Sequence, residues 1–151
     1  MSTCQNLPLP QLIATLFERT LARLMDFLEQ TEFGDLRATH FLNVFLHLRI
    51  DGKRSGELAR LAGMTPQSMG ELVDYLEQRG YVKRIPDPTD RRAKLVVYDE
   101  RGFEASQNLE LFYAELEQEW IDRIGPEYDS VFRASLVTLV SGGSGESSAS
   151  E

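Results

Sequence analysis

Two groups of side chains in this sequence have the chemistry needed to contact nucleic acid. The first group opens a predicted helix, where Gln67 can make a two-point contact with adenine and Glu71 can accept from the amino group of cytosine. In the same turn, Ser68 and the backbone N–H groups near Thr65 suit phosphate oxygens. The second group is basic and consists of Lys83, Arg84, Arg91, Arg92 and Lys94. Taken alone, either group could equally be a solvated surface.

The predicted contacts extend beyond these two groups. Gly70 has no side chain and permits a close approach of the helix, and Arg54 stands at the entry to the same region. The full set of predicted DNA contacts is Arg54, Thr65, Pro66, Gln67, Ser68, Gly70, Glu71, Lys83, Arg84, Asp90, Arg91, Arg92 and Lys94.

A helix, a tight turn and a second helix are predicted to position the first group. Ser55 is a suitable N-cap for the first helix, and Gly63 supplies the turn. Thr65 caps the second helix, with Pro66 at the first position, where a missing N–H costs nothing. Apolar residues at three- and four-residue steps predict the buried face of this helix: Met69, Leu72, Val73 and Leu76.

The basic group is predicted to lie on a two-stranded β-ribbon. Residues 81–85 and 95–98 are rich in strand-forming side chains. The segment between them, from Pro86 to Arg92, contains two prolines and several turn residues, so it is predicted to project as a loop. Residues 51–54 are predicted to be a loop that leads into the first helix. Helix, turn, helix and ribbon together indicate a winged helix-turn-helix.

In this region the chain resembles the MarR family of bacterial transcription regulators. The matching stretches are Glu57-Leu58-Ala59, Thr65-Pro66-Gln67-Ser68, Leu76-Glu77-Gln78-Arg79-Gly80-Tyr81-Val82, Asp90-Arg91-Arg92 and Asp99-Glu100-Arg101-Gly102. The resemblance implies a homodimer whose N- and C-terminal helices interlock. It also implies that Arg92 enters the minor groove, a narrow groove that favours an inserted guanidinium. Asp90 would then hold Arg92 in a fixed direction.

The remaining elements are predicted to be helical, so the fold class is mainly α with a small β-wing. Residues 9–140 form one domain: dimerisation helices at 9–35 and 100–140, and a winged helix-turn-helix at 36–99. A helix is expected at 37–49, and a Gly34-Asp35 break ends the first helix. Residues 1–8 are expected to be flexible and residues 141–151, which have almost no apolar content, to be disordered.

The net charge of −8 by itself argues against binding to nucleic acid, but the charges are unevenly distributed along the chain. Residues 51–94 hold nine basic and seven acidic side chains, a balance of +2, which leaves −10 for the remainder. A basic module on an acidic body can still present a positive face to DNA. The acidity also supports an alternative, in which the chain is a protein-interaction module that binds DNA weakly.

The sequence offers little support for other chemistry. It contains no nucleophile–base signature, phosphate loop or ligand cluster, so neither an enzyme nor a metal or cofactor is predicted. Family relatives respond to small phenolic or aromatic ligands, and the residues that could line such a pocket here are Phe17, His40, Phe41, Phe45 and Tyr75. These aromatic residues could equally be plain core. Cys4 is the single cysteine, which leaves a redox-sensing regulator as a further alternative.

These observations lead to one prediction of function. The chain is expected to be a cytoplasmic, sequence-specific DNA-binding regulator, with no signal peptide or membrane-spanning run. As a homodimer it would bind a pseudo-palindromic promoter site and repress transcription, with occupancy set by a small effector.

Overall fold

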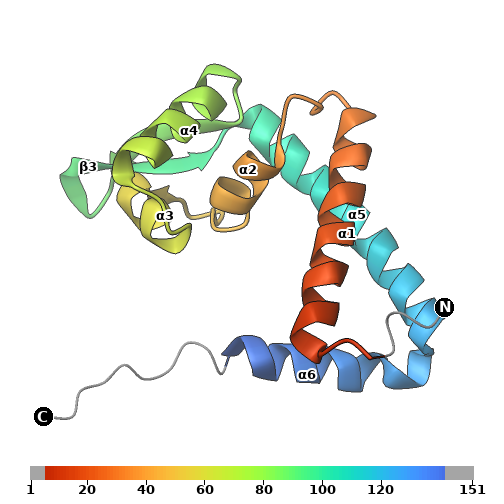
Figure 1. Cartoon of the computed structure of the whole chain (residues 1–151). Helices are drawn as coiled ribbons and strands as arrows, with labels where there is room; N and C mark the ends of the chain where they lie inside the picture. Colours follow the sequence, from red (N-terminus) through yellow and green to blue (C-terminus); the bar gives the residue numbers. More distant parts are fainter. Residues whose placement is uncertain (1–5, 142–151) are drawn as a thin grey trace, which may run out of the picture. The chain divides into compact units, whose positions relative to one another are not determined.

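The computed structural model describes residues 6–141, which fold into helices and one small antiparallel sheet (Figure 1). These residues form two compact units: the first ends at Glu110 and contains the helix-turn-helix and the wing (the winged unit), and the second begins at Leu111. Mainly helical structure with a small β-wing confirms the predicted fold class. Within the described residues, no helix is long and apolar enough to cross a membrane.

The helix-turn-helix consists of α3 (Ser55–Leu61) and α4 (Pro66–Gln78), which pack against each other (Figure 1). Gly63 makes the turn with a φ of 63°, a conformation that favours glycine. Met69, Val73 and Leu76 are fully buried, as their spacing predicted. Ser55 does not cap α3: it is the first residue of the helix, and the extended Arg54 precedes it without a side-chain cap.

The sheet has three strands rather than the two that were predicted. β2 (Val82–Asp87) and β1 (Lys53–Arg54) lie on either side of β3 (Asp90–Tyr98), and both pair with it antiparallel. The segment predicted as a loop before α3 therefore contributes a short edge strand, with Lys53 opposite Val96. This pairing satisfies backbone groups on the side of β3 that β2 leaves open.

The wing ends in a tight hairpin, so the prediction of a loop over residues 86–92 is wrong. Pro86 pairs with Lys94, and Asp87 pairs with Asp90. The register of the two strands shifts between Pro86 and Asp87. Proline is tolerated because β2 is an edge strand, where no neighbour needs its N–H. The Asp87 carboxylate accepts from the N–H of Thr89 at 2.8 Å and from its hydroxyl at 2.6 Å, which closes the turn.

The second helix of this unit is shorter than predicted, whereas α1 has the expected length of about five to six turns. α1 spans Leu9–Glu29 and so ends before the expected Gly34-Asp35 break. α2 (Ala38–His40) continues into a π-helical turn, η1 (Phe41–Phe45), so helical structure ends before residue 49. Phe41, Val44 and Phe45 are buried and contribute to the core of the winged unit.

The second unit contains the later turns of α5 (Glu100–Ile124) and the whole of α6 (Asp129–Ser141). Gly125 ends α5 with a φ of 98°, and a 3-10 turn, η2 (Pro126–Tyr128), leads into α6. An ion pair between Arg133 and Glu117 joins the two helices. Ser141, which was assigned to the tail, belongs to α6. Cys4 and residues 142–151 lie outside the described residues.

Candidate nucleic-acid interface

The first turn of α4 is held in place by its own cap. The Thr65 hydroxyl oxygen accepts from the Ser68 N–H at 3.1 Å, while the same hydroxyl donates to Ser68 Oγ at 2.9 Å. Because Ser68 Oγ accepts that proton, its own hydroxyl hydrogen stays available for an outside acceptor. This arrangement can present a donor to a phosphate oxygen at the helix start.

The exposed face of α4 carries polar side chains at helical spacing. Gln67, Glu71, Asp74 and Gln78 are exposed, opposite the buried apolar face. Gln67 Nε2 donates to Glu71 Oε1 at 3.4 Å. A side chain added at Gly70 would meet nothing within 4 Å, so this part of the helix surface is open to an approaching molecule. The surface can therefore lie close to base edges.

Three basic side chains of the wing are exposed: Arg91, Arg92 and Lys94. Within residues 6–141 none of them forms an ion pair. Asp90 Oδ1 accepts from the backbone N–H of Arg92 at 3.0 Å, so Asp90 fixes the backbone at Arg92 rather than its guanidinium. We call Arg91, Arg92 and Lys94 the wing cations, and they are free to meet an anion.

The other basic residues of the predicted interface are engaged by carboxylates of the same unit. Lys83 pairs with Asp99 at 2.8 Å, and Arg84 pairs with Asp74 and Glu77 of α4. Arg54 Nε donates to Asp87 at 2.7 Å. Their assignment as phosphate contacts stays a prediction, since each would have to share or leave its carboxylate partner.

Asp87 is the anchor of the wing turn. Hydrogen bonds from Thr89 and Arg54 stabilise its charged form against the effect of burial and lower its pKa to about 2. A carboxylate on β2 therefore ties the hairpin turn to Arg54 of β1 throughout the physiological range of pH. This link was not evident from the sequence, because Arg54 and Asp87 are 33 residues apart.

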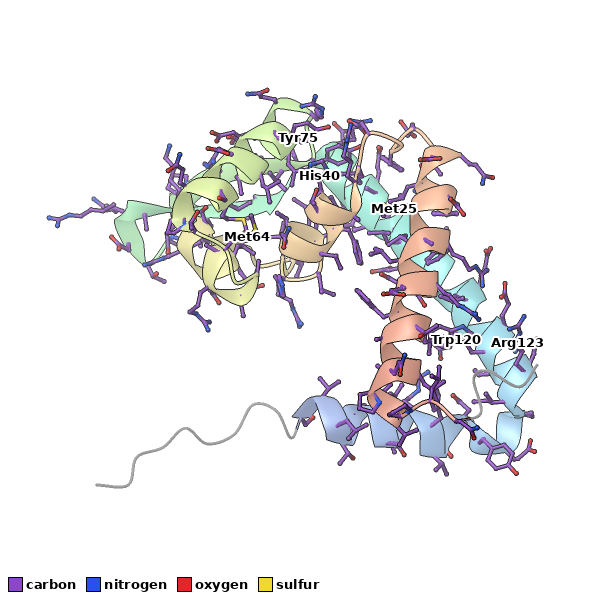
Figure 2. The ribbon with its side chains drawn as sticks, in the orientation of Figure 1. Met25, His40, Met64, Tyr75, Trp120 and Arg123 are labelled. Carbon is purple, nitrogen blue, oxygen red and sulfur yellow. The ribbon has the colours of Figure 1, made fainter. Side chains whose placement is uncertain are left out.

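The residues proposed for an effector pocket are only partly brought together. His40 of α2 stacks on Tyr75 of α4, with ring centroids 4.5 Å apart (Figure 2). Phe41 and Phe45 lie in the core, and Phe45 contacts Tyr98. About half of the Phe17 side chain is exposed on α1. None of the five residues lines the hollow along α6 or the hollow beside β3 and the start of α5, so the effector pocket stays a prediction.

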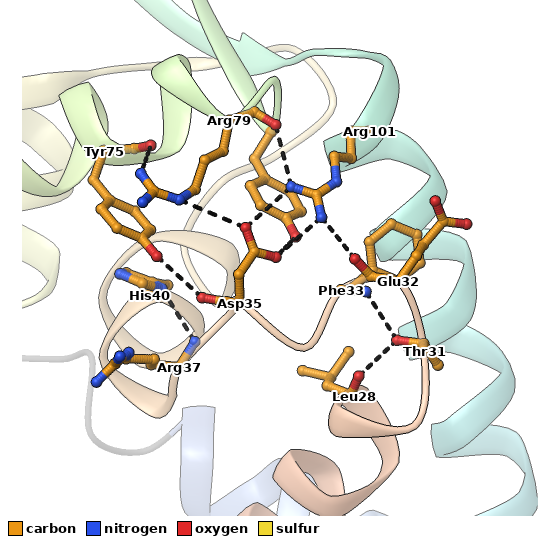
Figure 3. Close-up of polar contacts among 11 residues, drawn as sticks. Leu28, Thr31, Glu32, Phe33, Asp35, Arg37, His40, Tyr75, Arg79 and Arg101 are labelled. Carbon is orange, nitrogen blue, oxygen red and sulfur yellow. Dashed lines mark hydrogen bonds and ion pairs between the residues drawn. The ribbon is translucent and has the colours of Figure 1, made fainter.

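Asp35 lies at the centre of a polar network that sequence reasoning missed (Figure 3). Its carboxylate accepts from the Tyr81 hydroxyl at 2.5 Å and from two nitrogens of Arg101 at 3.1 Å. Arg79 lies 3.6 Å from the same carboxylate, and the Tyr75 hydroxyl donates to the Asp35 carbonyl. The network joins the α1–α2 connection to the end of α4 and the start of α5. No sequence signal marks it, because its partners are 40 to 66 residues from Asp35.

Two pKa shifts reflect this network. Partial burial of Asp35 opposes its ionisation, but hydrogen bonds from Tyr81 and Arg101 outweigh burial and lower its pKa. The pKa of His40 is lowered first by burial and then by the nearby Arg37 and Arg79. His40 Nδ1 also accepts from the backbone N–H of Arg37 at 3.0 Å, so the neutral ring fits the structure.

Sequence and structure comparisons place this arrangement among known proteins. The model of the MarR family matches residues 42–93, which run from η1 through α3 and α4 into the wing. Residues 42–93 therefore match the MarR family in sequence, and the chain shares the fold of solved MarR structures.

One curated relative matches a short part of the chain. The "Uncharacterized HTH-type transcriptional regulator YcgE" of Bacillus subtilis is 46% identical over 43 residues. These residues make up 28% of this chain and 28% of the length of that relative.

Solved MarR-family structures match much more of the chain. Streptococcus pneumoniae FabT, solved in complex with DNA, is 17% identical over 87% of this chain and 92% of its own, with a TM-score of 0.74. Wild-type E. coli MarR is 23% identical over 89% of this chain and 98% of its own, with a TM-score of 0.69. At these identities the likeness establishes the fold.

Proposed function

We propose that this chain is a DNA-binding transcriptional regulator of the MarR family that recognises an inverted repeat as a homodimer. The observation that carries the proposal is the set of wing cations, which are exposed and free of carboxylate partners within residues 6–141. The neighbouring Arg54, Lys83 and Arg84 are paired with carboxylates, whereas the wing cations keep their positive charge available where a wing would meet DNA. The DNA complex of FabT supports the same use of this fold.

The start of α4 supplies the base-reading part of the proposed interface. Recognition helices of this type enter the major groove with their first turns nearest the base edges. Gln67 and Glu71 are exposed there, and the absence of a side chain at Gly70 permits a close approach. The Ser68 hydroxyl and the wing cations would then hold phosphates or the minor groove on either side.

Exposed apolar side chains at both ends of the chain support the homodimer. On α1, Leu9 and Phe17 are 74% and 49% exposed. On α6, Leu139 and Val140 are 66% and 77% exposed. Burial of apolar surface of this kind in an interface with a second copy is favourable, and a two-fold protein suits a two-fold DNA site.

Two finer parts of the proposal concern regulation. A dimer bound over a promoter would block access of the transcription machinery, so we infer repression. We also infer that a small ligand controls occupancy, and the stacked His40 and Tyr75 are the part of the predicted pocket whose side chains meet. Screening phenolic and aromatic acids against the purified protein–DNA complex would test this: a compound that releases the DNA supports control by a ligand.

The test of the main proposal is selection of DNA by the purified full-length protein. Randomised 30-bp duplexes are bound at low and moderate salt, and the retained DNA is sequenced. Enrichment of an inverted repeat, with half-sites about one helical turn apart, supports the dimeric regulator. Binding that is absent even at low salt would instead favour the protein-interaction module.

The redox alternative concerns Cys4, which lies outside the described residues. Peroxide treatment should release DNA from the wild-type protein and not from Cys4→Ser if this alternative is correct. Equal binding by both proteins, with and without peroxide, would exclude it.

A further inference from the structure

Three carboxylates on α4 would face the negative charge of DNA if this helix enters the major groove: Glu71, Asp74 and Glu77. Two of them are paired with one arginine of strand β2. Arg84 pairs with Asp74 at 2.6 Å and also with Glu77, whose carboxylate accepts from the Arg84 backbone N–H at 2.9 Å. Arg84 is therefore a counter-ion for the later turns of α4.

Glu71 has no such counter-ion. Its side chain is exposed, and within residues 6–141 its carboxylate forms no ion pair. The single contact shown for this side chain is the hydrogen bond from Gln67 Nε2 at 3.4 Å, one turn closer to the helix start. Glu71 thus brings an uncompensated negative charge, with unused acceptor capacity, to the part of α4 that lies nearest the bases.

Such a carboxylate distinguishes bases because it can accept hydrogen bonds and cannot donate them. In the major groove, cytosine presents an amino donor, whereas guanine O6 and thymine O4 are acceptors that repel a carboxylate. Adenine also presents an amino donor, but its N7 acceptor lies beside it. Cytosine is the base whose groove edge offers the donor without a neighbouring acceptor.

We propose that Glu71 is a specificity-determining residue that selects cytosine at one position of each half-site and rejects guanine and thymine there. The inference rests on the proposed DNA-binding function and adds the chemical class of base that this part of α4 reads. On DNA that lacks the cytosine, Glu71 remains an unpaired charge near phosphates, so it lowers affinity for unrelated sequences as well. The acidic residue thereby contributes selectivity at the expense of general affinity.

The experiment compares base preferences of the wild-type full-length protein, Glu71→Ala, Glu71→Gln and Asp74→Asn by selection from randomised duplexes. Asp74→Asn is the matched control: it removes one negative charge from the same helix, but from a carboxylate already paired with Arg84. Binding titrations then compare the selected site with a duplex in which the cytosine is changed to guanine.

The wild-type protein and Asp74→Asn should both select cytosine at the same position and lose about 10-fold or more in affinity when it is replaced by guanine. Glu71→Ala should lose the preference at this position and bind unrelated DNA more tightly. Glu71→Gln should shift the preference to adenine, because an amide can contact N6 and N7 together.

An unchanged site in both Glu71 variants would overturn this inference while leaving the proposed function intact. The inference also fails if Asp74→Asn loses the preference to the same extent as Glu71→Ala, since helix charge rather than a base contact would then explain it. Failure of the wild-type protein and all variants to enrich any site would overturn the proposed function, and this inference with it.

Discussion

At the scale of single residues, the important distinction is between charges that are paired and charges that are free. Arg84 and Arg92 are both arginines of the wing hairpin, yet Arg84 is 21% exposed and holds two carboxylates of α4, whereas Arg92 is exposed and has no ion pair among the described residues. They should therefore have different effects when removed. Arg84 stabilises the fold, and Arg92 is available to a partner.

Replacing Arg92 with alanine should weaken binding to the selected DNA site by about 1–3 kcal/mol, because a groove or phosphate contact is lost. The slope of log affinity against log salt concentration should also become shallower by about one. Titrations at several salt concentrations would measure this slope. Arg123→Ala is the control, since it removes an exposed arginine from α5. If the two variants bind with equal affinity, Arg92 takes no part in recognition.

His40 predicts a dependence of stability on pH. Its folded-state pKa is lowered by burial, so in the acid range the unfolded chain binds the proton before the folded one does. The contribution of neutral His40 to the free energy of unfolding is complete above the pKa of histidine in the unfolded chain, about 6.5. This contribution is lost as the pH falls from there toward the lower pKa of His40 in the folded chain. Protonation at Nδ1 would also remove the acceptor of the Arg37 N–H.

Urea unfolding of the wild-type protein at pH 8, 7, 6 and 5 should show this loss. His40→Gln should flatten the dependence between pH 7 and 5. An equal slope in the wild-type protein and in His40→Gln would mean that the stacked His40 does not carry the effect.

At the scale of elements, the start of α5 is hydrogen-bonded to, and packs on, the backbone at Tyr81, where the wing begins. The Asp99 N–H donates to the Tyr81 carbonyl at 3.0 Å, and Arg101 lies over the Tyr81 ring. A side-chain carbon added at Gly102 would lie 1.8 Å from the Tyr81 carbonyl oxygen, a distance that no rotamer can relieve. The glycine is needed for close packing of a helix on backbone, a reason that its place in the sequence motif did not reveal.

Gly102→Ala should therefore lower the free energy of unfolding by about 3 kcal/mol, through displacement of α5 from the winged unit. Gly70→Ala is the matched control, because its added carbon meets nothing within 4 Å. Alanine there should be neutral or stabilise α4 by up to about 1 kcal/mol. Urea unfolding measures both, and equal stability of the two variants would contradict this account of Gly102.

At the scale of the whole molecule, the exposed apolar residues of α6 predict that association depends on this helix. Leu139→Glu should yield a monomer, because a carboxylate buried in an apolar interface is costly. Sedimentation measures the mass, and Gln107→Glu adds the same charge at an exposed site on α5 as the control. A Leu139→Glu dimer as tight as the control would place the interface elsewhere.

The sequence by itself determined most of the local elements and the resemblance of residues 42–93 to the MarR family. Helical spacing of apolar residues, the Thr65-Pro66 start and the glycine turns at Gly63 and Gly80 are local signals, and the structure confirms them. The position of the wing was predicted correctly, but its tip was predicted as a loop because the segment contains two prolines. The hydrogen bonds from Thr89 to the Asp87 side chain, which close a tight turn there, were not foreseen. The third strand was missed, since two residues are too short to show a pattern.

Only the tertiary structure decided which charges are free. Composition gives residues 51–94 a balance of +2, but that number does not reveal that Arg84 pairs with both Asp74 and Glu77, or that Arg54 pairs with Asp87. The Arg84 pairs span seven and ten residues between α4 and β2, whereas the Arg54–Asp87 pair and the network around Asp35 join residues at least 33 positions apart. Ion pairing depends on distances in space, so the free wing cations and the unpaired Glu71 emerge only when the chain has folded.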